Sequence, residues 1–136
     1  MSYSDFRLPD VIEKFALVTR EAPGIFADRQ PVQPSPLLGE YLRLHAPLVA
    51  AIGNGKARSE YIVAPVLAEV QRLHSTKIGF FSGVELSVDP ASGLTGTCDY
   101  LFSLTPEQLF VKAPIVTVVE AKKEDLAPAW ASAWRR

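Results

Sequence analysis

The chain has 136 residues, 48% of them hydrophobic and 21% charged, and 14 Lys and Arg against 15 Asp and Glu give a net charge of −1. We expect a single domain over residues 1–136, because this length suits one core. The charge balance excludes a global field that attracts polyanions, and a lone Cys98 excludes an intramolecular disulfide and a thiolate zinc cluster. No apolar run approaches the roughly 20 residues of a membrane span and no signal-peptide pattern opens the sequence, so we expect a cytoplasmic protein without a membrane partner.

The N-terminal part, residues 1–56, is expected to be a helical extension. Residues 5–20 predict a short helix that leads into an extended piece. Residues 21–36 predict an irregular connector, because they are rich in proline, which lacks a backbone donor and restricts the residue before it.

A longer helix is predicted in "SPLLGEYLRLHAPLVAAIGNG", where apolar residues recur at helical spacing. Ser35 can cap it, Pro36 suits its first turn, and Gly53 and Gly55 end it. His45 lies inside this helix without a companion ligand at helical spacing. We therefore expect His45 to be structural or to face solvent, not to be catalytic.

The next predicted helix covers residues 57–74, with Ser59 as the candidate N-cap. Pro65 leaves two alternatives open. Either the helix begins near Pro65, or it starts earlier and kinks there.

The apolar period then changes from 3.6 to 2 and predicts strands. Residues 77–89, the turn "PASG" and residues 94–104 form the pattern of a β-hairpin. A connector leads to residues 115–122, "IVTVVEAK", an apolar strand of the fully buried kind. Helices, an antiparallel hairpin and a last strand predict an α/β or α+β layer protein.

Charged side chains stand where these apolar strands predict a core. Asp99 lies between residues that favour burial, where a carboxylate costs several kcal/mol unless it is paired or binds a metal. Glu120 and Lys122 are two residues apart on the last strand and share a face, whereas Lys123 alternates to the other face. If the two strands are neighbours, Asp99, Glu120 and Lys122 converge. Two carboxylates suit Mg²⁺ or Mn²⁺, and an ammonium beside them can orient a water or stabilise charge on a phosphate.

The segments "CDY" and "VVEAKK" together resemble the bipartite motif of the PD-(D/E)xK nuclease superfamily, which has the restriction-endonuclease-like fold. Asp99, Glu120 and Lys122 match its Asp, Glu and Lys. The resemblance implies a catalytic site of these three residues, in which Asp99 and Glu120 hold Mg²⁺ or Mn²⁺ and Lys122 positions the attacking water. Cys98 stands where proline is common in the superfamily.

The resemblance covers roughly residues 57–126, which we expect to be a nuclease-like core. In the superfamily the helix before the hairpin often contributes an acidic metal ligand, and Glu60 is the matching position here. The backbone carbonyl of Ala121 is a further implied ligand. An exposed glutamate at a helix start, favoured by the helix dipole, is the alternative reading of Glu60.

Residues 127–136 form an atypical tail that departs from the superfamily pattern, in which a further helix and a last strand follow. Read two nucleotides later, codons for the tail from Ala127 to Arg135 can encode Ala-Gly-Leu-Gly-Gln-Cys-Leu-Ala, similar to the start of that helix. We therefore hypothesise a reading-frame slip near Ala127 that removes the helix and strand. The last predicted strand would then be an exposed edge, covered by another copy of the chain or by Trp130 and Trp134, and a homo-oligomer is expected.

These patterns predict a metal-dependent nuclease, with nucleic acid as its partner and with activity in doubt after the loss of a supporting helix. The first alternative is a catalytically silent nuclease-like module that binds or regulates, favoured by the near-neutral charge and the lack of a DNA-reading element. The second is a plain structural domain, in which Glu120, Lys122 and Lys123 form a solvated strand end and Asp99 lies in a turn or caps a helix.

Overall fold

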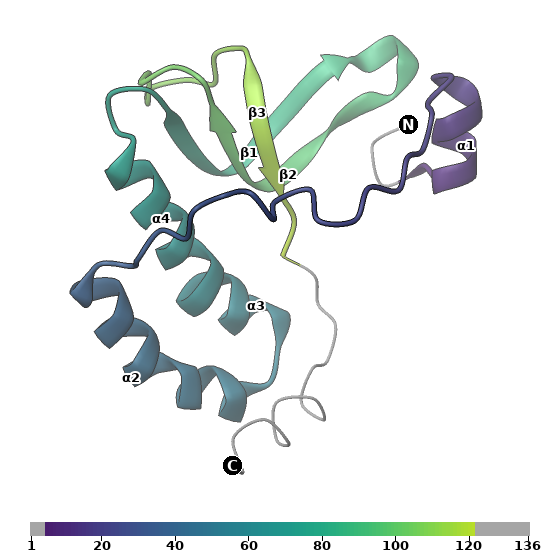
Figure 1. The fold of residues 1–136 in the computed structure, drawn as a ribbon. Coiled ribbons are helices and arrows are strands. Elements are labelled where there is room, and N and C mark those ends of the chain that lie inside the picture. The colour runs from purple at the N-terminus through teal and green to yellow at the C-terminus, as the bar shows by residue number, and fades with distance from the viewer. Residues whose placement is uncertain (1–4, 122–136) are drawn as a thin grey trace. The chain divides into compact units, whose positions relative to one another are not determined.

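The computed structural model describes residues 5–121, which form two compact units. One comprises residues 5–33 and 85–97, and the other comprises residues 34–84 and 98–121. Helices and a sheet occur together, so the chain is an α+β protein (Figure 1). The expected divisions of the sequence at residues 56 and 126 stay predictions, and the predicted tail at 127–136, with both tryptophans, lies outside the described residues.

In the first unit, helix α1 (Leu8–Lys14) is tied to the turn of the hairpin. The ammonium of Lys14 donates a hydrogen bond of 2.7 Å to the carbonyl oxygen of Ser92. The same ammonium lies 4.8 Å and 5.4 Å from the ring centroids of Phe6 and Phe15. Lys14 is therefore held by a backbone acceptor and two aromatic faces.

Helix α2 (Pro36–Ile52) begins and ends where its sequence signals predict. The side-chain oxygen of Ser35 accepts a hydrogen bond of 3.2 Å from the backbone N–H of Leu38. Gly53 ends the helix in the left-handed conformation, with φ of 70°. Glycine adopts this conformation without a steric penalty because it has no Cβ.

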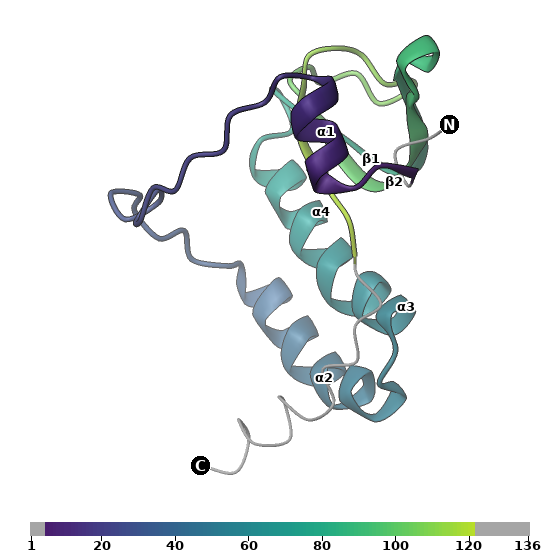
Figure 2. The same cartoon turned by 90° about the vertical axis from the view of Figure 1, so that its right-hand side faces the viewer.

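The second helical run is continuous from Gly55 to Leu73 and starts earlier than predicted. It consists of α3 (Gly55–Arg58), the π-helical turn η2 (Ser59–Val63) and α4 (Ala64–Leu73). The predicted cap at Ser59 is wrong, because the side chain of Asn54 caps the run by accepting the backbone N–H of Ala57 at 2.8 Å. Figures 1 and 2 show α2 alongside this run, which it contacts along α3, η2 and α4.

The π-helical turn explains how Pro65 fits inside the run. Proline cannot donate to the carbonyl four residues before it, and its ring clashes with that carbonyl in a regular α-helix. Here the N–H of Ala64 bonds to the carbonyl of Ser59, five residues back, which widens the helix just before Pro65. The helix thus passes through Pro65 and does not begin there.

The described strands form an antiparallel sheet in the order β1-β2-β3. The predicted hairpin is confirmed as β1 (Gly79–Asp89), a turn ending at Gly93 with φ of 82°, and β2 (Leu94–Ser103). Strand β3 (Ile115–Val119) pairs with β2, and this makes β2 the central strand.

The core gathers on β2, while β3 is largely open. Leu101 is fully buried, and the other buried hydrophobic residues among those described are Leu38, Ala57, Phe81, Cys98, Tyr100 and Phe102. The prediction that the last strand is fully buried is wrong, because Val116 is 50% exposed and Val118 is 47% exposed. Within residues 5–121, no helix has both the length and the apolar character needed to cross a membrane.

Candidate functional site

Asp99 lies on the central strand β2 and is exposed. Its neighbours Cys98 and Tyr100 are buried, with 4% and 5% of their surface exposed. Successive side chains of a strand point to opposite faces, so the two buried neighbours leave the carboxylate on the other face. The expectation of a buried Asp99 is therefore wrong, and its carboxylate is accessible to a ligand.

Glu120 follows β3 directly and is brought next to Asp99 by the pairing of β2 with β3. The register pairs Tyr100 with Val119, and one further step sets Asp99 opposite Glu120. The backbone N–H of Ala121 donates a hydrogen bond of 2.8 Å to Oδ2 of Asp99. This bond fixes the end of β3 to the carboxylate of β2.

The electrostatics of the site reflect this proximity. The pKa of Glu120 is raised, first by burial of its carboxyl group and next by the negative charge of Asp99, while a backbone hydrogen bond from Asp99 lowers it in part. The pKa of the Cys98 thiol is also raised, first by burial and then by the charges of Glu120 and Asp99. The negative charge of Asp99 is therefore close enough to Glu120 to disfavour ionisation of the Glu120 carboxyl group.

The predicted helical ligand Glu60 lies in the π-helical turn η2, with its carboxylate held by a lysine. Oε1 of Glu60 is 2.9 Å from Nζ of Lys56, one turn earlier, and the Glu60 side chain is 51% exposed. The described residues contain no group of three or more His, Cys, Asp or Glu side chains arranged to hold a metal ion. Asp99 and Glu120 are thus brought together, whereas Glu60 is paired elsewhere.

A tyrosine links the helix of Glu60 to the strand of Asp99. The hydroxyl of Tyr100 donates a hydrogen bond of 3.0 Å to the backbone carbonyl of Ser59. The side-chain oxygens of Ser59 and Tyr100 are 2.7 Å apart and form a second hydrogen bond. Residues adjacent in sequence to Glu60 and Asp99 are therefore bonded to each other, and the helical turn is fixed against β2.

The donor set suits a hard divalent cation. Asp99 and Glu120 offer carboxylate oxygens, which Mg²⁺ and Mn²⁺ prefer. A cation beside them would offset both the burial and the repulsion from Asp99 that raise the pKa of Glu120. The role of the Ala121 carbonyl as a ligand stays a prediction. Lys122, the predicted catalytic lysine, lies outside the described residues, as does Lys123.

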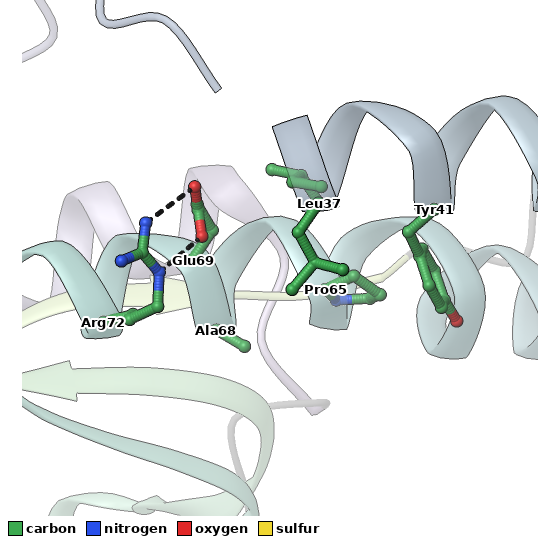
Figure 3. A pocket seen from close by; sticks show the side chains of 7 residues that line it. Leu37, Tyr41, Pro65, Ala68, Glu69 and Arg72 are labelled. Carbon is green, nitrogen blue, oxygen red and sulfur yellow. Dashed lines mark hydrogen bonds and ion pairs between the residues drawn. The ribbon is translucent and has the colours of Figure 1, made fainter. Parts of the chain in front are cut away.

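A shallow apolar groove of about 290 Å³ lies between α2 and α4 and contains none of the predicted site residues (Figure 3). At its edge, Nε of Arg72 donates a hydrogen bond of 2.9 Å to Glu69, which also accepts the backbone N–H of Ser35 at 2.9 Å. The hydrogen bonds from Arg72 and Ser35 lower the pKa of Glu69 to about 2. The groove is lined by Leu37, Leu38, Tyr41, Pro65, Ala68, Glu69 and Arg72.

His45 has the structural environment that its sequence context predicts. Its ring stacks on Tyr41 with centroids 4.0 Å apart and on Tyr61 with centroids 5.7 Å apart. Nδ1 of His45 is also 2.8 Å from the carbonyl oxygen of Tyr41. These contacts hold α2 against the π-helical turn.

The ion pair between Lys56 and Glu60 was not predicted from the sequence. A Lys and a Glu four residues apart are an ordinary helical pair, and this spacing could have revealed it. The predicted helix began at residue 57, however, which placed Lys56 outside it.

Comparison with known proteins gives no relative. No protein-family model matches the chain, and neither curated proteins nor solved structures provide a match. Functional inference therefore depends on the residues of the site itself.

Proposed function

We propose that the chain is a metal-dependent phosphodiesterase domain of the nuclease type, with a PD-(D/E)xK site. The observation that carries this proposal is that Asp99 and Glu120 lie opposite each other across the paired strands β2 and β3. The hydrogen bond from the N–H of Ala121 to Asp99 holds the end of β3 beside Asp99. The order of a helix, a hairpin with Asp on its second strand and a neighbouring strand that ends in Glu also supports a restriction-endonuclease-like core.

In this proposal Asp99 and Glu120 hold Mg²⁺ or Mn²⁺. An ion held there would supply a water of lowered pKa and a Lewis acid for the phosphate. Asp99 is positioned to act as a ligand because the N–H of Ala121 already orients one of its carboxylate oxygens. Lys122, two residues after Glu120, orients the attacking water and stabilises the negative charge that develops on the phosphate.

The substrate class that follows is a nucleic acid. A net charge of −1 provides no long-range attraction for a polyanion, so local contacts around the site must bind the substrate. A cation held by Asp99 and Glu120 would be one such contact, because it would neutralise the two carboxylates that otherwise repel a phosphate.

Hydrolysis of end-labelled DNA and RNA in the presence of Mn²⁺ tests the proposal. We expect cleavage by the wild type, loss of cleavage in Asp99→Asn and in Lys122→Ala, and full cleavage by Glu40→Gln. The last variant is a matched control, because it removes one carboxylate charge from an exposed ion pair on α2. A folded wild type that binds the oligonucleotides and cleaves none would instead support the silent binding module.

A further inference from the structure

The segment that leads into helix α2, residues 30–34 with the sequence "QPVQP", is exposed throughout and belongs to no helix or strand. Even its apolar side chain, Val32, is 77% exposed. Within the described part of the chain, residues 30–34 form no hydrogen bond or ion pair. The backbone and the side chains of this segment are therefore accessible to a partner.

The spacing of the prolines favours a polyproline II conformation in this segment. The rings of Pro31 and Pro34 hold φ at about −65°, and the residue before each proline is kept out of the helical region. Ser35, which precedes Pro36, has φ of −62° and ψ of 153°, close to the polyproline II values. Polyproline II has about three residues per turn, so Pro31 and Pro34 lie on the same edge of such a helix.

The end of the segment is anchored where α2 begins. The backbone N–H of Ser35 donates a hydrogen bond of 2.9 Å to Oε1 of Glu69 on α4. The side-chain oxygen of Ser35 accepts the backbone N–H of Leu38 at 3.2 Å. A stiff segment with one fixed end loses less conformational freedom on binding than a flexible one, and this favours its affinity for a partner.

A basic side chain stands beside the prolines. Arg29 lies two residues before Pro31, and its side chain is 76% exposed. Its Nε is 3.7 Å from Oδ1 of the neighbouring Asp28, in an ion pair that is exposed on both sides. Such a pair contributes little to stability, so the guanidinium can bind a carboxylate of a partner instead.

We propose that residues 29–34 are a binding segment for a protein domain whose groove is lined by aromatic side chains and has a carboxylate at one end. Grooves of this kind, as in SH3 and WW domains, bind proline-rich segments that are already ordered as polyproline II. In the complex Pro31 and Pro34 pack against the aromatic rings, and Arg29 binds the carboxylate. The inference does not depend on the proposed nuclease function and gives the chain a protein partner in addition.

Fluorescence anisotropy of a panel of purified, labelled SH3 and WW domains, titrated with the full chain, tests the inference. We expect saturable binding by at least one domain of the panel. Pro31→Ala and Pro34→Ala should each lower the affinity for that domain by about tenfold, as expected for central contacts of an interface. Arg29→Ala should also weaken binding and make it less sensitive to salt, because an ion pair with the domain is lost.

Two matched variants make the result specific. Pro23→Ala removes an exposed proline from the same connector but outside residues 29–34, and it should bind as the wild type does. Arg20→Ala removes an exposed cation outside the segment, and it should change neither the affinity nor its salt dependence. All the substituted side chains are exposed, so each variant should fold, which circular dichroism checks.

The inference is overturned if no domain of the panel binds the chain. It is equally overturned if a domain binds and both Pro31→Ala and Pro34→Ala keep the affinity of the wild type. In either case residues 29–34 would be only a semi-rigid spacer before α2, as proline-rich segments often are.

Discussion

Removal of the Tyr100 hydroxyl should weaken the attachment of the second helical run to the sheet. The Tyr100→Phe change deletes the bond of 3.0 Å to the Ser59 carbonyl and the bond of 2.7 Å to the Ser59 side chain. The ring remains in place, because Tyr100 is only 5% exposed and stacks on Phe80 with centroids 5.9 Å apart. At about 0.5–1.5 kcal/mol for each bond, the free energy of unfolding should fall by about 1–3 kcal/mol.

A double-mutant cycle tests whether these two bonds are the cause. Ser59→Ala deletes only the side-chain bond and should cost about 0.5–1.5 kcal/mol. Since Tyr100→Phe already removes that bond, the double variant should unfold with the same free energy as Tyr100→Phe alone, measured by urea denaturation. The reasoning is refuted if the two single effects add, or if Tyr100→Phe is as stable as the wild type.

Three further predictions concern acid stability, the core and the sheet edge. The pKa of Glu69 is lowered to about 2 by hydrogen bonds from Arg72 and Ser35, so its contribution to stability is present above its ordinary pKa of 4.5 and is lost as the pH falls toward 2. In Glu69→Gln the urea midpoint should therefore change less between pH 5 and pH 2 than in the wild type, and an unchanged pH profile would contradict this. Leu101→Ala, at a fully buried position, should lower the free energy of unfolding by about 2–5 kcal/mol, and a loss below 1 kcal/mol in urea denaturation would show that β2 is not the core strand. Because Val118 on β3 is 47% exposed, we expect copies of the chain to associate through this edge; Val118→Lys should then convert oligomer to monomer in light scattering, and a monomeric wild type would refute it.

Local sequence signals predicted those elements that depend on contacts within a few residues. Ser35, Pro36 and Gly53 fix the bounds of α2 through capping and backbone preference, and the "PASG" turn fixes the hairpin. Such interactions are complete within one turn of the chain, so they can be recognised without tertiary information.

The helix start at Asn54 was not predicted, although Asn54 caps the run through a local hydrogen bond of the same kind. Pro65 suggested a start or a kink nearby, but a π-helical turn removes the steric conflict and lets the helix continue through it. The wrong start also excluded Lys56 from the helix and concealed its pairing with Glu60. An error in one cap therefore hid the ion pair that holds the carboxylate of the predicted ligand Glu60.

Exposure depends on packing between elements, which local patterns do not determine. The β-branched residues of β3 suggested burial on both faces, yet the strand lies at one side of the described sheet and Val116 and Val118 are half exposed. Asp99 was expected to be buried because its neighbours favour burial, but strand alternation places it on the open face. The proximity of Asp99 and Glu120 could be predicted only if their strands pair. The observed register shows that β2 and β3 do pair.

Calorimetric titration of the purified chain with Mn²⁺ tests the central claim, that Asp99 and Glu120 form a metal site. The account predicts saturable binding by the wild type, loss of binding in Asp99→Asn, and unchanged binding in Glu40→Gln, which removes an equal charge from α2. A folded wild type that releases or absorbs no heat with Mn²⁺, or an Asp99→Asn variant that binds as tightly as the wild type, would contradict it.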